Sequence, residues 1–180
     1  AASDVYKRQM LDESTIWLVR LQGVGYAKAE EMVNAGVSGP NIRAAGVNYD
    51  VRWAHPYSVY DQVDWEPAVE KPTSVKGADC YDRYRVRMEE MRQSCRMMLD
   101  AIEKIPGGKN TNYANGDEMI LAKAPTRAPE GATGFSHYEC TRGASQFYIQ
   151  GGGDGRGKNP YRLSIRSPMF ITIPFVAKTM

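Results

Sequence analysis

One continuous helical pattern constrains this chain more than any other feature. Between residues 79 and 105, apolar or semi-polar side chains recur at alternating steps of three and four: Tyr81, Tyr84, Met88, Met91, Cys95, Met98, Ile102 and Ile105. That spacing places them all on one side of an α-helix. Asp79 is a suitable N-cap, and the Pro-Gly-Gly of residues 106–108 ends the pattern. The sequence therefore predicts a helix of about 40 Å, at about 1.5 Å per residue.

A stripe of this length must pack against something. Opposite charges one turn apart on the other faces, such as Arg96 and Asp100, contribute only about 0.2–0.5 kcal/mol per pair. The sequence contains no second helical pattern of comparable length to receive the stripe. The helix is therefore expected to belong to a larger object, with its packing partners outside this chain.

Composition argues against several classes of protein. The 180 residues carry a formal net charge of +2, which does not indicate a broad nucleic-acid-binding surface. There is no apolar run of the roughly 18 residues that a membrane span needs, and no secretory signal pattern. Three cysteines are too few for a disulfide framework and favour a reducing compartment.

The first part of the chain has little regular pattern. Residues 1–10 look detached from the rest and resemble an expression or sequence-read scar, so they are excluded from the fold prediction. Residues 27–35 predict a short helix that ends at Gly36. Residues 36–78 are rich in Gly, Pro, Tyr and Asp and show no clear period. An irregular segment of that length is more often functional or held by partners.

The strand signal comes late in the chain. Between residues 161 and 166, Tyr, Leu and Ile alternate with Arg, Ser and Arg, which is the period of a strand. Residues 137–142 and 146–150 predict two more strands, separated by Gly143, and the glycine-rich residues 151–160 predict a hairpin loop. The apolar run 168–180 has no closing cap, so the chain is expected to be cut there. The predicted class is α+β with a small C-terminal antiparallel β portion.

The cysteines and histidines give no metal site. Cys80 and Cys95 are fifteen residues apart on the predicted helix. They are therefore about 22 Å apart, too far to share a metal or a disulfide. Cys140 lies on a separate strand, and no Cys-x-x-Cys pair occurs. His55 and His137 are isolated in the sequence. This chain alone is therefore expected to ligate no metal, no iron–sulfur cluster and no nickel.

Several longer motifs resemble one known family. One block reads SGPNIRAAGVNYDVR and another reads GADCYDRYRVRMEEMRQS. In order and spacing they resemble the D subunit of NADH-quinone oxidoreductase, the hydrogenase-large-subunit-like part of respiratory complex I. The resemblance covers roughly residues 12–175, and its motifs lie at residues 38–52, 55–65, 77–94, 138–149 and 159–170.

The resemblance implies a fold. Family members are similar to the large subunit of nickel–iron hydrogenase, which is built around a helical bundle. The helix at 79–105 would be one member of that bundle, and its arginines would face solvent and neighbouring subunits. Full-length members are about twice as long as this chain. Residues 11–180 would therefore form a partial domain, truncated at both ends.

The resemblance also implies a function. The parent would help to pass electrons from NADH, through iron–sulfur clusters in partner subunits, to a quinone, and this transfer drives ion translocation. The quinone cavity would lie between this subunit and its cluster-bearing neighbour, among the peripheral-arm subunits at the cytoplasmic face of the inner membrane. The subunit would bind no NAD directly. The histidine and tyrosine that hold the quinone in this family belong to the N-terminal part outside this chain, so no quinone ligand is expected here.

Two alternatives stay open. Large subunits of membrane-bound, energy-converting nickel–iron hydrogenases share the first block. A non-catalytic scaffold that keeps only the fold and the assembly contacts is the other. The strand motif also departs from the family, because Glu-x-Pro-Arg-Gly-Glu becomes Glu139-Cys-Thr-Arg142-Gly-Ala here. Residues 70–76 likewise replace a shorter link.

The residues best placed for function combine arginines with carboxylates. An arginine near a redox centre can stabilise the negative charge added on reduction, and this effect is larger where water is excluded. Its planar fork can equally hold a carboxylate for structural reasons, as when Asp50 and Arg52 tie down a loop by bidentate pairing. The structural role is favoured. The candidate polar network comprises Arg43, Asp50, Arg52, Glu139 and Arg142.

Overall fold

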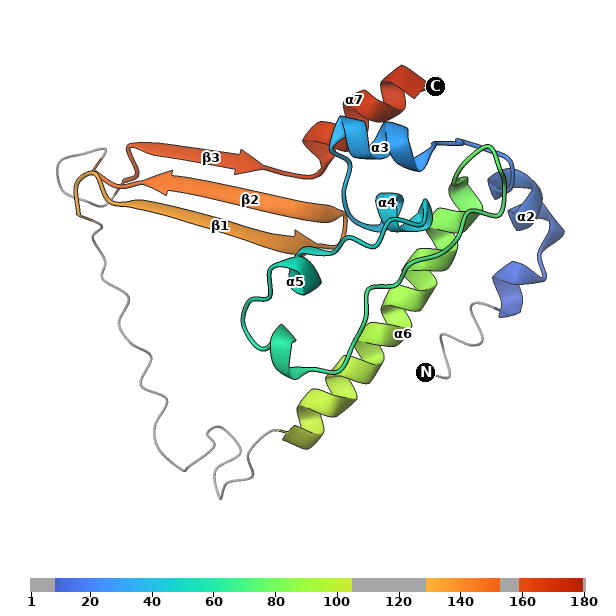
Figure 1. Ribbon diagram of the computed structural model, residues 1–180, viewed down its shortest axis with the longest axis horizontal. Helices are drawn as coiled ribbons and strands as arrows, with labels where there is room; N and C mark the ends of the chain where they lie inside the picture. The colour runs from blue at the N-terminus through green and yellow to red at the C-terminus, as the bar shows by residue number, and fades with distance from the viewer. Residues whose placement is uncertain (1–8, 105–128, 153–158, 180) are drawn as a thin grey trace. The chain divides into compact units, whose positions relative to one another are not determined.

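The chain combines helices with one small antiparallel sheet. The computed structural model describes residues 9–104, 129–152 and 159–179 (Figure 1). The chain separates into two compact units. Of the described residues, one unit holds 9–97, 137–145 and 166–179, and the other holds 98–104, 129–136, 146–152 and 159–165. The predicted α+β class is confirmed, whereas the hydrogenase-like architecture stays a prediction.

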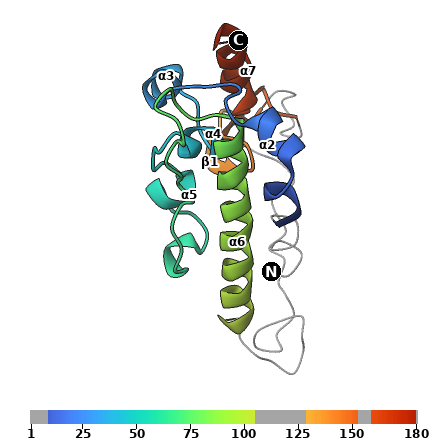
Figure 2. The same cartoon turned by 90° about the vertical axis from the view of Figure 1, so that its right-hand side faces the viewer.

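The first unit is mainly helical. In chain order its helices are α2 (Thr15–Leu21), α3 (Ala29–Ala35), α4 (Pro40–Ala44), α5 (Val51–Ala54), the 3-10 turn η1 (Tyr60–Gln62), the first part of α6 (Cys80–Lys104), and α7 (Met169–Thr179). Helices α2 and α4 lie on different sides of α6 (Figures 1 and 2). Its apolar core is formed by Ala27, Met32, Val37, Ile42, Ala44, Ala45, Ala78 and Val86, with Ile171 and Phe175 of α7 packed against it.

The short helix predicted at 27–35 is confirmed. Helix α3 ends at Gly36, whose φ of 73° is the left-handed conformation that a helix C-cap commonly requires. The next segment differs from the prediction, because residues 36–78 contain α4, α5 and η1. These elements have five, four and three residues, too few to show a helical period in the sequence. Only their starts have a local signal, such as the Gly39-Pro40 step that begins α4.

The long helix is confirmed over residues 80–104. Asp79 caps it, because its Oδ1 accepts a hydrogen bond from the Asp82 N–H at 2.9 Å. The Asp82 carboxylate accepts in return from the Asp79 N–H at 3.2 Å. This reciprocal arrangement satisfies backbone donors that the start of a helix otherwise leaves free. Ile105 and the predicted stop at 106–108 lie outside the described residues.

Helix α6 is buried on a side that its apolar stripe does not include. Asp82 and Val86 on that side are fully buried, and Val86 belongs to the apolar core. Met88 of the stripe, two residues further on and therefore on nearly the opposite side of the helix, is buried as well. Beyond Met88 the stripe is largely uncovered in the part of the chain that the structure describes, since Met91 is 46% and Met98 is 57% exposed, while Cys95 is half-buried. The periodicity thus predicted the helix correctly. The periodicity did not predict which side of α6 is buried by the other described residues of this chain.

The three predicted strands are confirmed; the first two start earlier than predicted, and the third starts one residue later. They are β1 (Thr133–Cys140), β2 (Gly143–Gln150) and β3 (Arg162–Arg166), in the order β1-β2-β3 (Figure 1). Residues 137–145, at the turn between β1 and β2, belong to the helical unit. Residues 168–180, for which no element was predicted, include helix α7.

Two glycines let the β1–β2 turn lie against the start of α4. A Cβ on Gly39 would stand 2.4 Å from the Cα of Gly143, and one on Gly143 would stand 2.6 Å from the Ser38 hydroxyl. Both glycines have positive φ, 77° and 125°. The Ser38 hydroxyl accepts a hydrogen bond from the Ala144 N–H at 3.0 Å. This contact brings the end of β1, including Glu139, to α4.

Candidate functional site

A buried arginine at the end of α4 joins four parts of the helical unit. The Arg43 side chain is 2% exposed. Its Nη1 lies 3.0 Å from a carboxylate oxygen of Asp50 and 3.0 Å from one of Glu139. It also donates to the Tyr49 carbonyl at 3.0 Å, and Nε donates to Glu90 of α6 at 3.1 Å. The guanidinium therefore connects α4, the entry to α5, strand β1 and helix α6.

Asp50 holds a second arginine. Its two carboxylate oxygens accept from Nε and Nη2 of Arg52 at 2.9 and 2.7 Å, so the bidentate pairing indicated by the sequence is present. Asp50 also caps α5 by accepting from the Arg52 N–H. The Arg52 guanidinium lies over the rings of Trp65 and Tyr60, with centroids at 4.6 and 5.5 Å. Burial alone would lower the pKa of Arg52, but the hydrogen bond and charge of Asp50 raise it.

Glu139 is the link to the strand. One oxygen accepts from Arg43, and the other accepts from the Val51 N–H at 3.3 Å, at the start of α5. Its own N–H donates to the Tyr57 hydroxyl at 3.3 Å. Burial raises the pKa of the Glu139 carboxyl, and the neighbouring Asp50 raises it further, while Arg43 opposes both.

These five charged side chains, which we call the Arg43 network, carry an excess negative charge. Two guanidinium groups, Arg43 and Arg52, face three carboxylates, so 2 − 3 leaves one negative charge. Asp50 and Glu139 are 0% and 3% exposed, whereas Glu90 is 23% exposed and reaches water. Removing one member of a buried ion cluster leaves a buried charge without its partner, which is costly. The geometry suits a structural clamp.

The structure brings together four of the five sequence candidates. Arg142 lies apart from them. It is exposed at the β1–β2 turn and lines a cavity with residues of α7. Sequence reasoning missed Glu90. Glu90 follows Asp82 and Val86 at helical spacing, on a side of α6 that the apolar stripe did not indicate.

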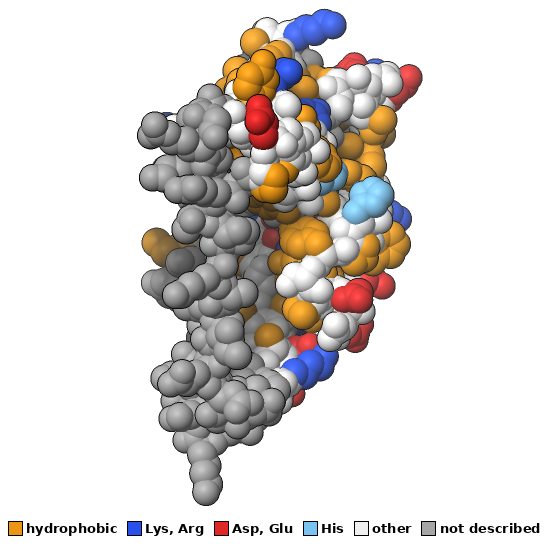
Figure 3. Space-filling model, turned by 90° about the vertical axis from the view of Figure 1, so that its left-hand side faces the viewer, with side chains coloured by type: hydrophobic (Ala, Val, Ile, Leu, Met, Phe, Trp, Pro, Cys, Tyr) orange, Lys and Arg blue, Asp and Glu red, His pale blue; other side chains and the backbone are white. Residues whose placement is uncertain are grey.

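The two histidines are neighbours in space. The rings of His55, after α5, and His137, on β1, have centroids 6.4 Å apart, so their separation in the sequence was misleading. Burial lowers the pKa of His137, and the nearby His55 and Arg166 lower it further. Figure 3 shows histidine side chains at the surface beside apolar ones. Among the residues that the structure describes, no group of three potential ligands could hold a metal ion.

Known proteins resemble this chain in sequence. The family model described as "Respiratory-chain NADH dehydrogenase, 49 Kd subunit" matches residues 3–180. The chain belongs to this family. The resemblance identified from the motifs is therefore confirmed, and the match includes most of residues 1–10, which look detached in the sequence.

Curated relatives of the 49 kDa family align over nearly the whole chain. The H subunit of NAD(P)H-quinone oxidoreductase from Synechococcus sp. (strain JA-2-3B'a(2-13)) is 35% identical over 94% of this chain and 45% of its own length. The D 1 subunit of NADH-quinone oxidoreductase from Chloroherpeton thalassium is 35% identical over 95% and 41%. The D 2 subunit from Solibacter usitatus is 39% identical over 92% and 40%. The chain thus spans less than half the length of these relatives.

The cysteines of this 49 kDa family member are free thiols. Cys80, Cys95 and Cys140 are each half-buried. Within residues 9–104, 129–152 and 159–179, no helix combines the length and the hydropathy needed to cross a membrane.

Proposed function

We propose that this chain is part of the subunit through which an NADH:quinone oxidoreductase passes electrons to its quinone. Electrons from NADH would travel through iron–sulfur clusters in partner subunits, and quinone reduction would drive ion translocation. The observation that carries this proposal is the family match over residues 3–180, supported by relatives named as quinone oxidoreductase subunits. The parent would sit peripherally at the cytoplasmic face of the inner membrane.

The chain's own contribution would be mechanical. The quinone would bind between the full-length parent and its cluster-bearing neighbour, and this chain alone would bind no cofactor. The Arg43 network supports that role, because it fixes a strand, two short helices and α6 to one another through charges that are mostly buried. A cavity wall built from these elements would hold its shape during turnover.

Arg142 is the candidate for electrostatic tuning. It is exposed, and it is not a member of the Arg43 network. We expect Arg142→Met in the intact complex to leave assembly normal. If the potential of the nearest cluster or the rate of quinone reduction then shifts, Arg142 has a redox role; if neither changes, it has none. Failure to assemble would give it a structural role. Arg162→Met, on exposed β3, is the matched control.

The alternative enzyme is a nickel–iron hydrogenase large subunit, and the alternative without catalytic activity is a scaffold. The coding sequence on either side of this chain distinguishes these functions. Two Cys-x-x-Cys pairs would indicate a hydrogenase, because four thiolates hold its metals. A histidine and a tyrosine at the N-terminal quinone positions, without those pairs, would indicate the quinone enzyme. Residues 1–180 contain no Cys-x-x-Cys pair.

The test of the proposal is the activity of the parent assembly. It would be purified through a tag on the full-length parent and supplied with NADH and a short-chain quinone, or with hydrogen and a viologen dye. We expect NADH-dependent quinone reduction that a quinone-site inhibitor blocks, and no hydrogen-dependent dye reduction. Hydrogen-dependent reduction would establish the hydrogenase, and inactivity in both assays would establish the scaffold.

A further inference from the structure

The helical unit contains a second feature, distinct from the Arg43 network. A cavity of about 900 Å³ opens between the start of α6, the α3–α4 region and α7. One part of its wall is apolar and open to water, with Val24 and Val176 at 46% and 37% exposed. The other part carries three arginines, namely Arg83, Arg87 and Arg142.

None of these three arginines pairs with a carboxylate among the described residues. Arg83 donates to the carbonyls of Gly25 and Ala78 at 2.7 and 3.3 Å. Arg87 donates to the Arg83 carbonyl at 3.0 Å. Carboxylates do lie beside other arginines of the same unit, at 3.2 Å or less, as for Arg43, Arg52, Arg85 and Arg92.

The cavity therefore has an uncompensated positive charge. In this structure Arg87 and Arg142 are exposed to water, and Arg83 is half-buried. Arginines are costly to remove from water unless an anion pairs with them. Any group that fills this cavity and excludes water from it must bring negative charge.

The occupant of the cavity must also carry apolar surface. An inorganic anion on the arginines would fill only a small part of the volume and would leave the apolar wall in contact with water. A stretch of polypeptide that carries a carboxylate beside aliphatic or aromatic side chains satisfies both parts of the wall. Its carboxylate can also accept two parallel hydrogen bonds from one guanidinium.

We propose that this cavity is the binding site of an acidic and apolar segment of the parent polypeptide from outside residues 1–180, whose carboxylate pairs with Arg87 or Arg142. Curated relatives are more than twice as long as the region they share with this chain, which covers 40–45% of them. A segment of the same polypeptide reaches the cavity at a high effective concentration. The proposal rests on membership of the family and not on quinone chemistry.

Zero-length crosslinking tests this pairing in the assembled parent. Arginine does not react with carbodiimide-activated carboxylates, whereas a lysine amine in its place forms an amide with a carboxylate that touches it. Arg87→Lys and Arg142→Lys keep the charge, and both arginines are exposed, so both variants are expected to assemble. Mass spectrometry would identify the crosslinked peptides. Arg85→Lys is the positive control, because Arg85 lies 2.8 Å from Glu70 within the chain.

We expect at least one of the two variants to crosslink to an aspartate or glutamate of the parent outside residues 1–180, and the wild type to show no such product. A crosslink to another subunit, or only to a carboxylate within residues 1–180, would overturn the proposal. So would a crosslink of Arg85→Lys to Glu70 without any product at position 87 or 142.

Discussion

At the scale of single residues, Arg43 is the centre of the charged cluster. It is almost completely buried, and each of its guanidinium nitrogens has a carboxylate or carbonyl partner. Its partners come from segments that lie far apart in the sequence, such as Glu90 and Glu139. A short apolar residue at position 43 would leave those carboxylates facing one another.

We therefore expect Arg43→Met to cost about 3–5 kcal/mol of folding stability, the usual result of breaking a buried ion cluster. The measurement is the amount of parent subunit retained in the assembled complex, together with its thermal denaturation. Arg85→Met is the matched control, because Arg85 and Glu70 are 29% and 25% exposed and such pairs contribute about 0–1 kcal/mol. Equal effects of the two substitutions would contradict the structural role of Arg43.

A second expectation concerns pH. Burial holds the pKa of His137 below its ordinary value of 6.5, so the folded state favours the neutral ring. As pH falls below 6.5, the unfolded chain takes up its proton first, and the contribution of His137 to stability is lost. Hydrogen exchange of residues 137–145 in the parent should therefore accelerate between pH 7.5 and 5.5 after correction for the chemical rate, a window of about one unit on each side of the unperturbed pKa.

His137→Gln isolates this effect. The substitution removes the imidazole but leaves the Glu139 carboxyl, whose raised pKa acts in the opposite direction because its stabilising effect is lost as pH rises. The difference in protection between wild type and variant should shrink towards low pH. A difference that stays constant over the window would show that the pKa of His137 is the same in the folded and open states, which contradicts this expectation.

The sequence allowed part of the network to be predicted. Asp50 and Arg52 are two residues apart, so their pairing could be predicted from local chemistry. Glu139 belongs to a strand motif that resembles the family's, so it could be chosen as a candidate. Glu90 could not be assigned, because the apolar stripe of α6 indicated a different side of the helix as the buried one.

At the scale of elements, the fold depends on a backbone contact between α4 and the β1–β2 turn. Gly39 and Gly143 approach so closely that no side chain fits between them. The contact fixes where β1 ends, and with it the position of Glu139 beside Arg43. The turn and the Arg43 network therefore support each other, since both hold β1 to α4.

Gly39→Ala should disrupt this contact. The new Cβ would stand 2.4 Å from the Gly143 Cα, which no rotamer relieves, and the positive φ adds backbone strain of order 1–3 kcal/mol. Gly46→Ala is the control, since its φ of 86° gives the same strain while its nearest contacts are at 3.7 Å. The measurement is hydrogen exchange at residues 137–145, with faster exchange expected only for Gly39→Ala. Similar exchange in both variants would mean that strain alone explains the loss.

Element length decided what could be predicted at this scale. Helix α6 has 25 residues, so its period is repeated many times and is visible in the sequence. Helices α4 and α5 have five and four residues and follow from caps and long-range contacts instead. The strands were found by alternation, but the early starts of β1 and β2 depend on pairing that no local pattern records.

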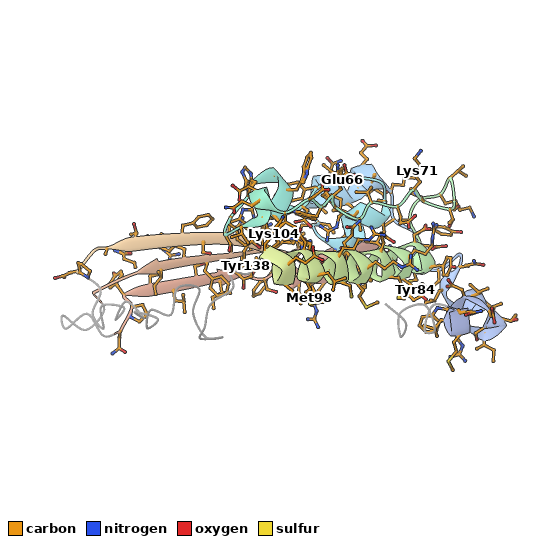
Figure 4. All side chains as sticks on the ribbon, turned by 90° about the horizontal axis from the view of Figure 1, so that it is seen from below. Glu66, Lys71, Tyr84, Met98, Lys104 and Tyr138 are labelled. Carbon is orange, nitrogen blue, oxygen red and sulfur yellow. The ribbon has the colours of Figure 1, made fainter. Side chains whose placement is uncertain are left out.

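At the scale of the whole molecule, much apolar surface has no cover in the described residues. On α6, Met91 and Met98 are 46% and 57% exposed, and Figure 4 shows Tyr84 and Met98 along the same edge of this helix. On α7, Phe170 and Ile173 are 67% and 59% exposed. Apolar patches of this kind mark surfaces that bind other protein.

Residues 1–180 produced alone should therefore aggregate or bind a hydrophobic dye strongly. Burying each such side chain is worth about 1.5–3 kcal/mol, which favours association over a soluble monomer. Met91→Gln with Met98→Gln should reduce dye binding, whereas Thr15→Gln with Gln93→Asn, which change polar positions, should not. A cooperative melt of a monomer without dye binding would contradict this expectation.

We have proposed that the parent of this chain is needed to deliver electrons to quinone. The direct measurement is NADH-dependent quinone reduction by membranes from which the parent gene has been deleted and then restored. We predict that deletion abolishes inhibitor-sensitive quinone reduction and that restoration recovers it. Reduction of a water-soluble acceptor by NADH should persist wherever the electron-entry subunits still assemble. Undiminished inhibitor-sensitive quinone reduction in the deletion strain would contradict the account.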